Sequence, residues 1–439
     1  MSVTTRAGRP RSAGGLARAI VACVGVGSAL AVVTPGVGAV VVAGAMVAGA
    51  CAVGRLAAER MRQPGVVGEL AAAILLGPAA LGALAPEAFG MVFTPMAMTV
   101  IGAAGKVGVV VLAFRLGRDL DNSVSSRTFR RATLVSLAAT MAPLAAGCVV
   151  AAMLKPPLRD TQGGVASVIF VGVALSITAF PVLARMLDDT GLRRTPVGQM
   201  ALTAAAMSDA IAWLILSVLA ALGEQAVFAG MARLLLAVAA VAVITFVVVA
   251  MRSKKAAEPR PAVGARPSHP HLLAAAVIAA SHVAGLHLVF GSFVAGLILR
   301  SGQSPRDTTQ HPLPAVDRVF LPLFFFHAGH SLDLRDLSPH HLSVAALIIA
   351  IAISTKVIAA GAAAWRVGFP ARQVLALGVL LNTRGVTELI VLRVGLDLNV
   401  LSPSLYTILT LGAVVTTVMT VPALRVLGLD KEVCSGAPQ

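Results

Sequence analysis

The stretch that decides the fold is QMALTAAAMSDAIAWLILSVLAALG, residues 199–223. It exceeds the ~20 apolar residues that cross a bilayer, and its single charge is Asp209. At about 1.5 Å of rise per residue, Asp209 lies roughly 15 Å along the helix from Gln199. A carboxylate at that depth costs about 3 kcal/mol, and such residues usually face the bundle interior, where they handle a cation or a proton. The alternative is a carboxylate that reaches the surface or is held in a structural ion pair.

The composition indicates a polytopic membrane protein. Of 439 residues, 57% are hydrophobic and 12% are charged, whereas soluble domains are about 25% charged. The 35 Lys and Arg residues exceed the 19 Asp and Glu residues. The basic residues lie in short loops between apolar runs, a pattern that sets topology and does not indicate a nucleic-acid partner. The 4 cysteines and 9 histidines show no metal-ligand spacing, so we expect no cofactor.

The apolar segments and charged loops divide the chain into parts, two of which are transmembrane halves. In chain order the parts are a tail with an extra transmembrane helix (1–35), the first half (36–225), a linker helix with a basic loop (226–270), the second half (271–428) and a short tail (429–439). The apolar segment within the first part could instead be a signal peptide. The short last part predicts that no large regulatory domain follows the helices.

Basic residues decide how many helices to expect. Residues 271–299 form either one long helix or two short ones. Only if this region is split do Arg300 and Arg366 lie on the same side as Arg60 and Lys254, as the positive-inside rule requires. The sequence therefore predicts an all-α protein with about 14 transmembrane helices and both termini in the cytoplasm.

The two halves contain an internal repeat. Phe114-x-x-Gly117-x-x-Leu120-Asp121 matches Phe326-x-x-Gly329-x-x-Leu332-Asp333, and with this topology the copies cross the membrane in opposite directions. Inverted repeats are typical of secondary transporters, whose sites lie where the repeats meet.

Two segments in equivalent places of the halves are interrupted by polar residues, prolines or glycines. Broken helices in corresponding positions indicate a transporter's binding site. Carbonyls freed by Pro181 near Ile177 and the hydroxyl of Thr178 are ligands suited to a hard cation. A simple proline kink and a charged packing pair are the alternative. The interrupting residues are Ser176, Thr178 and Pro181 in the first half and Asn382, Thr383, Arg384 and Gly385 in the second.

Further polar residues are candidates near this site. Lys356 is the only charge in residues 342–365 and needs a partner, for which Asp209 and Glu388 are candidates. Arg384 and Glu388, at i and i+4, are able to pair with each other instead. Ser208 precedes Asp209 and either supplies a hydroxyl to the ion or bonds its own backbone.

Several motifs together resemble the bacterial and plant cation/proton exchangers of the monovalent cation:proton antiporter superfamily. They cover residues 63–422, about four-fifths of the chain. In chain order they are QPGVVGELAAAILLGP (63–78), ALSITAFPVLARMLDDTGL (174–192), AAMSDAIAWLIL (205–216), FGSFVAGLIL (290–299), LPLFFFHAG (321–329) and LLNTRGVTELIVLRVGLDL (380–398).

The resemblance implies an antiporter fold in which two broken helices cross beside the helix carrying Asp209. It implies that Asp209 binds the cation or the proton, that Lys356 lies beside the crossing, and that Thr178 and residues 383–385 form it. It also implies a homodimer in which a mobile core moves against a dimerisation domain. The sequence departs from the family at Ser208, where relatives usually carry Asn, Asp or Gln, which leaves one carboxylate instead of two.

We interpret the chain as a transporter of the bacterial plasma membrane that exchanges Na⁺ or K⁺ for protons, and not as an enzyme. No Walker motif, phosphate-binding glycine loop or nucleophile–base pair is present. The alternatives are an exporter of an organic cation or metabolite on the same fold, which the scarcity of Tyr and Trp disfavours, and a scaffold that has lost transport.

Overall fold

The structure is a computed structural model, and the residues that it describes are all helical or in short connections, with no strand among them. The described residues are 35–78, 80–119, 126–154, 158, 164–223, 275, 277–279, 288–299, 313–329 and 338–429. The all-α expectation is therefore confirmed for this part of the chain.

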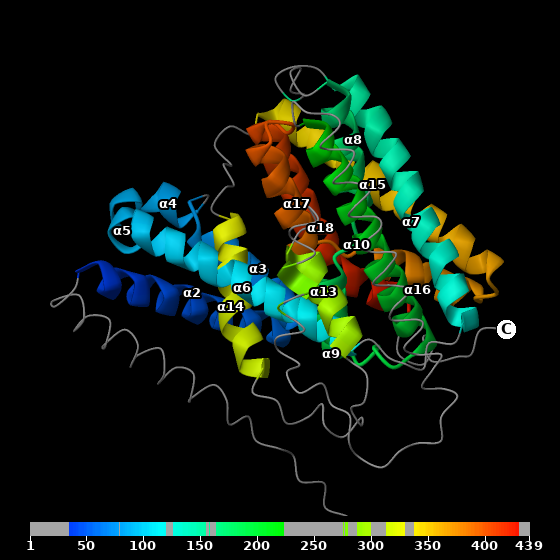
Figure 1. Ribbon diagram of the computed structural model, residues 1–439, viewed down its shortest axis with the longest axis horizontal. Helices are drawn as coiled ribbons and strands as arrows, with labels where there is room; N and C mark the ends of the chain where they lie inside the picture. The colour runs from blue at the N-terminus through cyan, green and yellow to red at the C-terminus, as the bar shows by residue number, and fades with distance from the viewer. Residues whose placement is uncertain are drawn as a thin grey trace, which may run out of the picture.

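The helices form two groups that lie side by side (Figure 1). The first group contains α2 (Pro35–Arg60), α3 (Gly65–Leu76), α4 (Leu81–Leu84), α5 (Pro86–Val92), α6 (Pro95–Asp119), α13 (Leu288–Leu299) and α14 (Leu313–Gly329). The second contains α7 (Ser126–Met153), α8 (Gly164–Ser176), α9 (Phe180–Thr190), α10 (Pro196–Gly223), α15 (Pro339–Arg366), α16 (Ala371–Leu381), α17 (Val386–Asp397) and α18 (Pro403–Val426).

Among the described residues, seven stretches are long and apolar enough to span a membrane, and two of them, Gly65–Leu84 and Gly164–Thr190, each contain two helices. They are Gly36–Arg60, Gly65–Leu84, Pro95–Arg115, Thr128–Met153, Gly164–Thr190, Pro339–Arg366 and Pro403–Val426. The total of about 14 stays a prediction, because the expected segments 16–33, 227–251 and most of 271–287 lie outside the described residues, as does the basic loop after residue 251.

Close helix packing in the first group depends on glycine. Gly54 of α2 and Gly68 of α3 face each other, and a Cβ built on Gly68 would lie 2.0 Å from the carbonyl oxygen of Gly54. Small residues allow such backbone approach between membrane helices. The α2–α3 pair thus depends on the absence of side chains at these two positions.

Both predicted interruptions are present. The helix α8 ends at Ser176, residues 177–179 are not helical, and α9 begins at Phe180 with Pro181 in its first turn. A proline is tolerated in the first turn, where its missing N–H would have no helical partner. Pro181 therefore lies at the start of a second helix, as the predicted broken helix requires, and the alternative of a simple proline kink is wrong.

The second interruption, between α16 and α17, requires a glycine. Gly385 precedes α17 with φ 151°, a conformation that side chains rarely allow. A Cβ on Gly385 would also lie 2.7 Å from Cγ2 of Val182 in α9. This glycine therefore lets the second broken helix approach the first.

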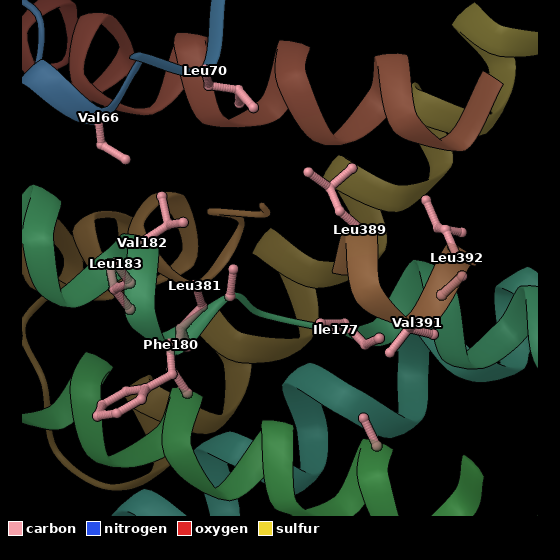
Figure 2. Close-up of a cluster of buried hydrophobic side chains, with 14 of the residues drawn as sticks. Val66, Leu70, Ile177, Phe180, Val182, Leu183, Leu381, Leu389, Val391 and Leu392 are labelled. Carbon is pink, nitrogen blue, oxygen red and sulfur yellow. The ribbon is translucent and has the colours of Figure 1, made fainter. Parts of the chain in front are cut away.

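The two groups meet where α3 packs on α9. Figure 2 shows Val66 and Leu70 of α3 opposite Val182 and Leu183 of α9, all of them buried. Apolar contact at this boundary joins the second group to the first.

Polar contacts accompany this apolar boundary. Arg185 Nη2 of α9 lies 2.6 Å from Glu69 Oε1 of α3, and Arg55 Nη1 of α2 lies 3.5 Å from the same oxygen. The backbone N–H of Gly65 donates to Asp189 Oδ2 at 3.1 Å. Glu69 is 3% exposed and the Arg185 side chain is 18% exposed, so a partly buried ion pair links the two groups.

Candidate functional site

Asp209 lies in α10, inside the second group, and is 9% exposed. Its Oδ2 accepts hydrogen bonds from the backbone N–H of Phe180 at 3.3 Å and from the hydroxyl of Thr387 at 3.1 Å. Its Oδ1 is buried and has no hydrogen-bond partner among the described residues. The carboxylate is therefore held through one oxygen, and the other is available to a proton or a cation.

The two non-helical stretches meet beside Asp209. The Thr178 hydroxyl donates to the Leu381 carbonyl at 2.9 Å, and the Ala179 N–H donates to the Thr383 carbonyl at 3.0 Å. Figure 2 shows Ile177, Phe180 and Leu381 around this crossing. Backbone groups released by the two breaks thus bond each other, as the absence of water in lipid demands.

Lys356 of α15 is completely buried, and its partners are carbonyl oxygens. Its Nζ donates to the carbonyls of Ser176 and Ile177 at 2.7 Å each. These are among the carbonyls left without helical partners at the C-terminal end of α8, where partial negative charge favours a cation. The structure therefore pairs Lys356 with a helix end, and the Ile177 carbonyl, expected as a cation ligand, is occupied by the ammonium.

Arg384 approaches the same end of α8 from the opposite broken helix. Its Nη1 donates to the Ala174 carbonyl at 2.9 Å and its Nη2 to the Leu175 carbonyl. The same Nη1 lies 2.8 Å from Glu388 Oε1. Glu388 is thus the partner of Arg384 and not of Lys356, so the i, i+4 alternative describes the structure.

The backbone of Arg384 is held by α18. The Arg384 N–H donates to Thr417 Oγ1 at 3.2 Å, while the Thr417 hydroxyl donates to the Arg384 carbonyl at 2.6 Å. A reciprocal pair of this kind supports the non-helical turn on which Arg384 lies.

The other predicted residues are near the crossing but differ in what they contribute. The Ser208 hydroxyl accepts from Thr140 at 2.9 Å and lies 3.1 Å from Ser136 Oγ, both on α7, so it bonds a neighbouring helix and not its own backbone. Ser176 supplies a carbonyl, since its hydroxyl donates to Val173. Asn382 ends α16 as its C-cap and is buried.

Sequence reasoning missed the hydroxyl of Thr387 and the ion pair of Glu69 with Arg185. Glu69 is the only charge in the apolar run 65–76, and a lone charge in such a run is the same signal that marks Asp209. Thr387 carries no such signal, because a threonine in a membrane helix usually bonds its own backbone.

The chemistry that this arrangement supports is the binding of a proton or a hard cation by oxygen. The described residues contain no cluster of three or more His, Cys, Asp or Glu side chains able to hold a metal ion. A single carboxylate near hydroxyls and carbonyls favours a weakly held monovalent cation, since tight divalent sites collect more charged ligands.

A family model and several known proteins match this chain over most of its length. The family model "Sodium/hydrogen exchanger, transmembrane" matches residues 43–426. The chain is 33% identical to "Cation/H(+) antiporter 17" of Arabidopsis thaliana over 82% of this chain and 45% of that protein. It is 31% identical to "Na(+)/H(+) antiporter NhaS4" of Synechocystis over 83% of this chain and 90% of that protein.

Among solved structures, the sodium proton antiporter MjNhaP1 of Methanocaldococcus jannaschii superposes with a TM-score of 0.59 at 14% identity, covering 96% of this chain and 99% of that one. This likeness shows the antiporter fold. The chain spans about half the length of several curated relatives, such as 45% and 46% of two plant proteins. The extent of the family match nevertheless shows that the chain belongs to the sodium/hydrogen exchanger family.

Proposed function

We propose that this protein is a secondary transporter of a bacterial plasma membrane that exchanges a monovalent cation, Na⁺ or K⁺, for protons. The observation that carries the proposal is Asp209, a buried carboxylate with one oxygen held by two donors and the other without a partner among the described residues. Related proteins are named Na⁺/H⁺ and K⁺/H⁺ antiporters, which supports both the reaction and the class of cation.

In this proposal a proton and a cation compete for Asp209. Burial disfavours the ionised carboxylate, and a bound cation restores it. Thr178, whose hydroxyl oxygen keeps acceptor capacity while it donates to Leu381, is the additional ligand that we assign. The neighbouring hydroxyl of Ser208 supports the helix that carries Asp209, and one carboxylate implies one cation for one proton.

The positive side chains at the crossing have a different role in this proposal. Lys356 and Arg384 both donate to carbonyls at the end of α8. They compensate the partial negative charge of that helix end, and Glu388 balances Arg384. The crossing thereby stays folded while Asp209 alternates between ionised and neutral states.

Alternating access then requires the second helix group to move against the first. The site lies within the second group, whereas the contacts of α3 with α9 lie between the groups. A movement at that boundary exposes Asp209 to each side in turn without dismantling the crossing. We propose that the protein acts as a homodimer in which the first group provides the fixed part.

The test measures proton movement in everted membrane vesicles by fluorescence dequenching after addition of Na⁺, K⁺ or Li⁺. Asp209→Asn keeps the shape of the side chain and removes the ionised form, so we expect no cation-induced signal from this variant. Asp188→Asn, at a side chain that is 50% exposed, is the matched control and keeps the wild-type signal.

Normal exchange by Asp209→Asn refutes the proposal. A rate in the wild type that depends on membrane potential contradicts only the one-for-one stoichiometry.

A further inference from the structure

Thr387 differs from most threonines of the described helices in where its hydroxyl points. Thr203, Thr355 and Thr416 each donate to a backbone carbonyl three or four residues earlier in their own helix. Thr387 is the second residue of α17, and the residues before Val386 are not helical. No preceding turn offers it a carbonyl, so its hydroxyl is directed to Asp209 instead.

The contact joins elements far apart in the sequence. Both donors to Asp209 Oδ2 come from the first turns of helices, the Phe180 N–H from α9 and the Thr387 hydroxyl from α17. The N-terminal ends of both broken helices, which carry partial positive charge, therefore converge on one carboxylate oxygen. The side-chain donor among them is Thr387.

We propose that Thr387 is a positioning residue that sets the balance between proton and cation at Asp209, an inference that rests on the proposed function. A hydrogen bond donated to a carboxylate stabilises its ionised form relative to its protonated form. The ionised form is the one that binds a cation. Thr387 thus favours cation over proton, and it keeps Oδ2 occupied so that Oδ1 is the reacting oxygen.

The charged side chains around Asp209 have other partners and do not take the place of the Thr387 hydroxyl as a donor to the carboxylate. Lys356 of α15 bonds the end of α8, Arg384 before α17 bonds α8 and Glu388, and Arg185 of α9 pairs with α3. The helix α8 contains no charged residue, and α7 has its basic residues within its first two turns. The Thr387 hydroxyl is therefore the direct side-chain contact through which this carboxylate is stabilised.

The test compares Thr387→Val, which keeps the shape and removes the hydroxyl, with Thr387→Ser, which keeps the hydroxyl. Thr203→Val is the matched control, since that hydroxyl on the same helix as Asp209 bonds only the Gln199 carbonyl. Cation-induced proton movement is measured in everted vesicles over a range of pH and cation concentrations, with Asp209→Asn as the inactive reference.

We expect Thr387→Val to shift the acidic limb of the pH–rate profile to higher pH by about one unit, because loss of a hydrogen bond to a charged group changes proton affinity about tenfold. At a fixed pH on that limb, the apparent KM for the cation rises by a similar factor, while the maximal rate at high pH stays near that of the wild type. Thr387→Ser and Thr203→Val follow the wild-type profile.

A purely structural role for Thr387 would lower the amount of folded protein or the maximal rate and leave the pH midpoint in place, and that result overturns the inference. If Thr387→Val does not accumulate in the membrane, Thr387→Ala gives the same comparison. Exchange that persists in Asp209→Asn defeats the proposed function itself. An unchanged profile in Thr387→Val with an inactive Asp209→Asn defeats only the role of Thr387.

Discussion

Replacement of Lys356 by methionine tests whether the crossing depends on the buried ammonium. Lys356→Met keeps the length of the side chain and leaves the carbonyls of Ser176 and Ile177 without the Nζ donor that each now has at 2.7 Å. A buried acceptor left without a partner costs about 1–3 kcal/mol, so the two carbonyls together cost about 2–6 kcal/mol.

The opposing contribution is the removal of a charge from a completely buried position. Burial of that charge has a desolvation cost of its own, and its removal offsets part of the loss from the two carbonyls. We therefore expect the free energy of unfolding to fall by about 3 kcal/mol, in the lower half of the range for two unpaired carbonyls.

The assay is thermal unfolding of the purified protein in detergent, followed by the loss of its monodisperse chromatographic peak. Lys106→Met is the matched control, because Lys106 on α6 is exposed and the same chemical change removes no buried contact. We expect Lys356→Met to unfold at a clearly lower temperature than the wild type. Lys106→Met should unfold at the same temperature as the wild type. Equal unfolding temperatures of the two variants would refute the reasoning.

Two further predictions concern the boundary between the helix groups and the topology. Glu69→Gln removes the charge that Arg185 faces in the partly buried pair and should lower the unfolding temperature. Glu59→Gln, in an exposed pair, should have little effect. An equal fall of the unfolding temperature in both variants would show that the Glu69–Arg185 pair contributes no more stability than an exposed pair. Ser253→Cys should react with an impermeant maleimide only after the cells are permeabilised, since the basic residues predict a cytoplasmic loop there; labelling of intact cells would contradict the 14-helix topology.

Local sequence features were sufficient to predict the membrane class, the two interruptions and the unusual buried charges. A lone charge in an apolar run, as at Asp209 or Lys356, is costly wherever the helix packs. Gly385 and Pro181 interrupt helices for reasons within their own backbone. The pairing of Arg384 with Glu388 was one of the predicted alternatives because i and i+4 share a helix face.

The partners of these groups were not predictable in the same way. Periodicity shows which residues share a face of one helix, but not which helix lies opposite or at what depth. The Lys356 ammonium bonds carbonyls 180 and 179 residues away in sequence, and backbone carbonyls leave no residue-specific signal. A simple kink at Pro181 stayed an alternative because sequence alone does not say whether the chain continues in one helix or starts another.

The sequence by itself indicated that Asp209 is buried in a membrane protein of this class. A charged side chain within an apolar segment is costly in lipid, whichever helices surround that segment. Only the tertiary structure decided how Asp209 is held. The Thr387 hydroxyl and the Phe180 N–H reach it because the breaks in the two halves bring the N-terminal ends of α9 and α17 together. Convergence of that kind depends on the packing of helices distant in sequence, which no spacing within either segment specifies.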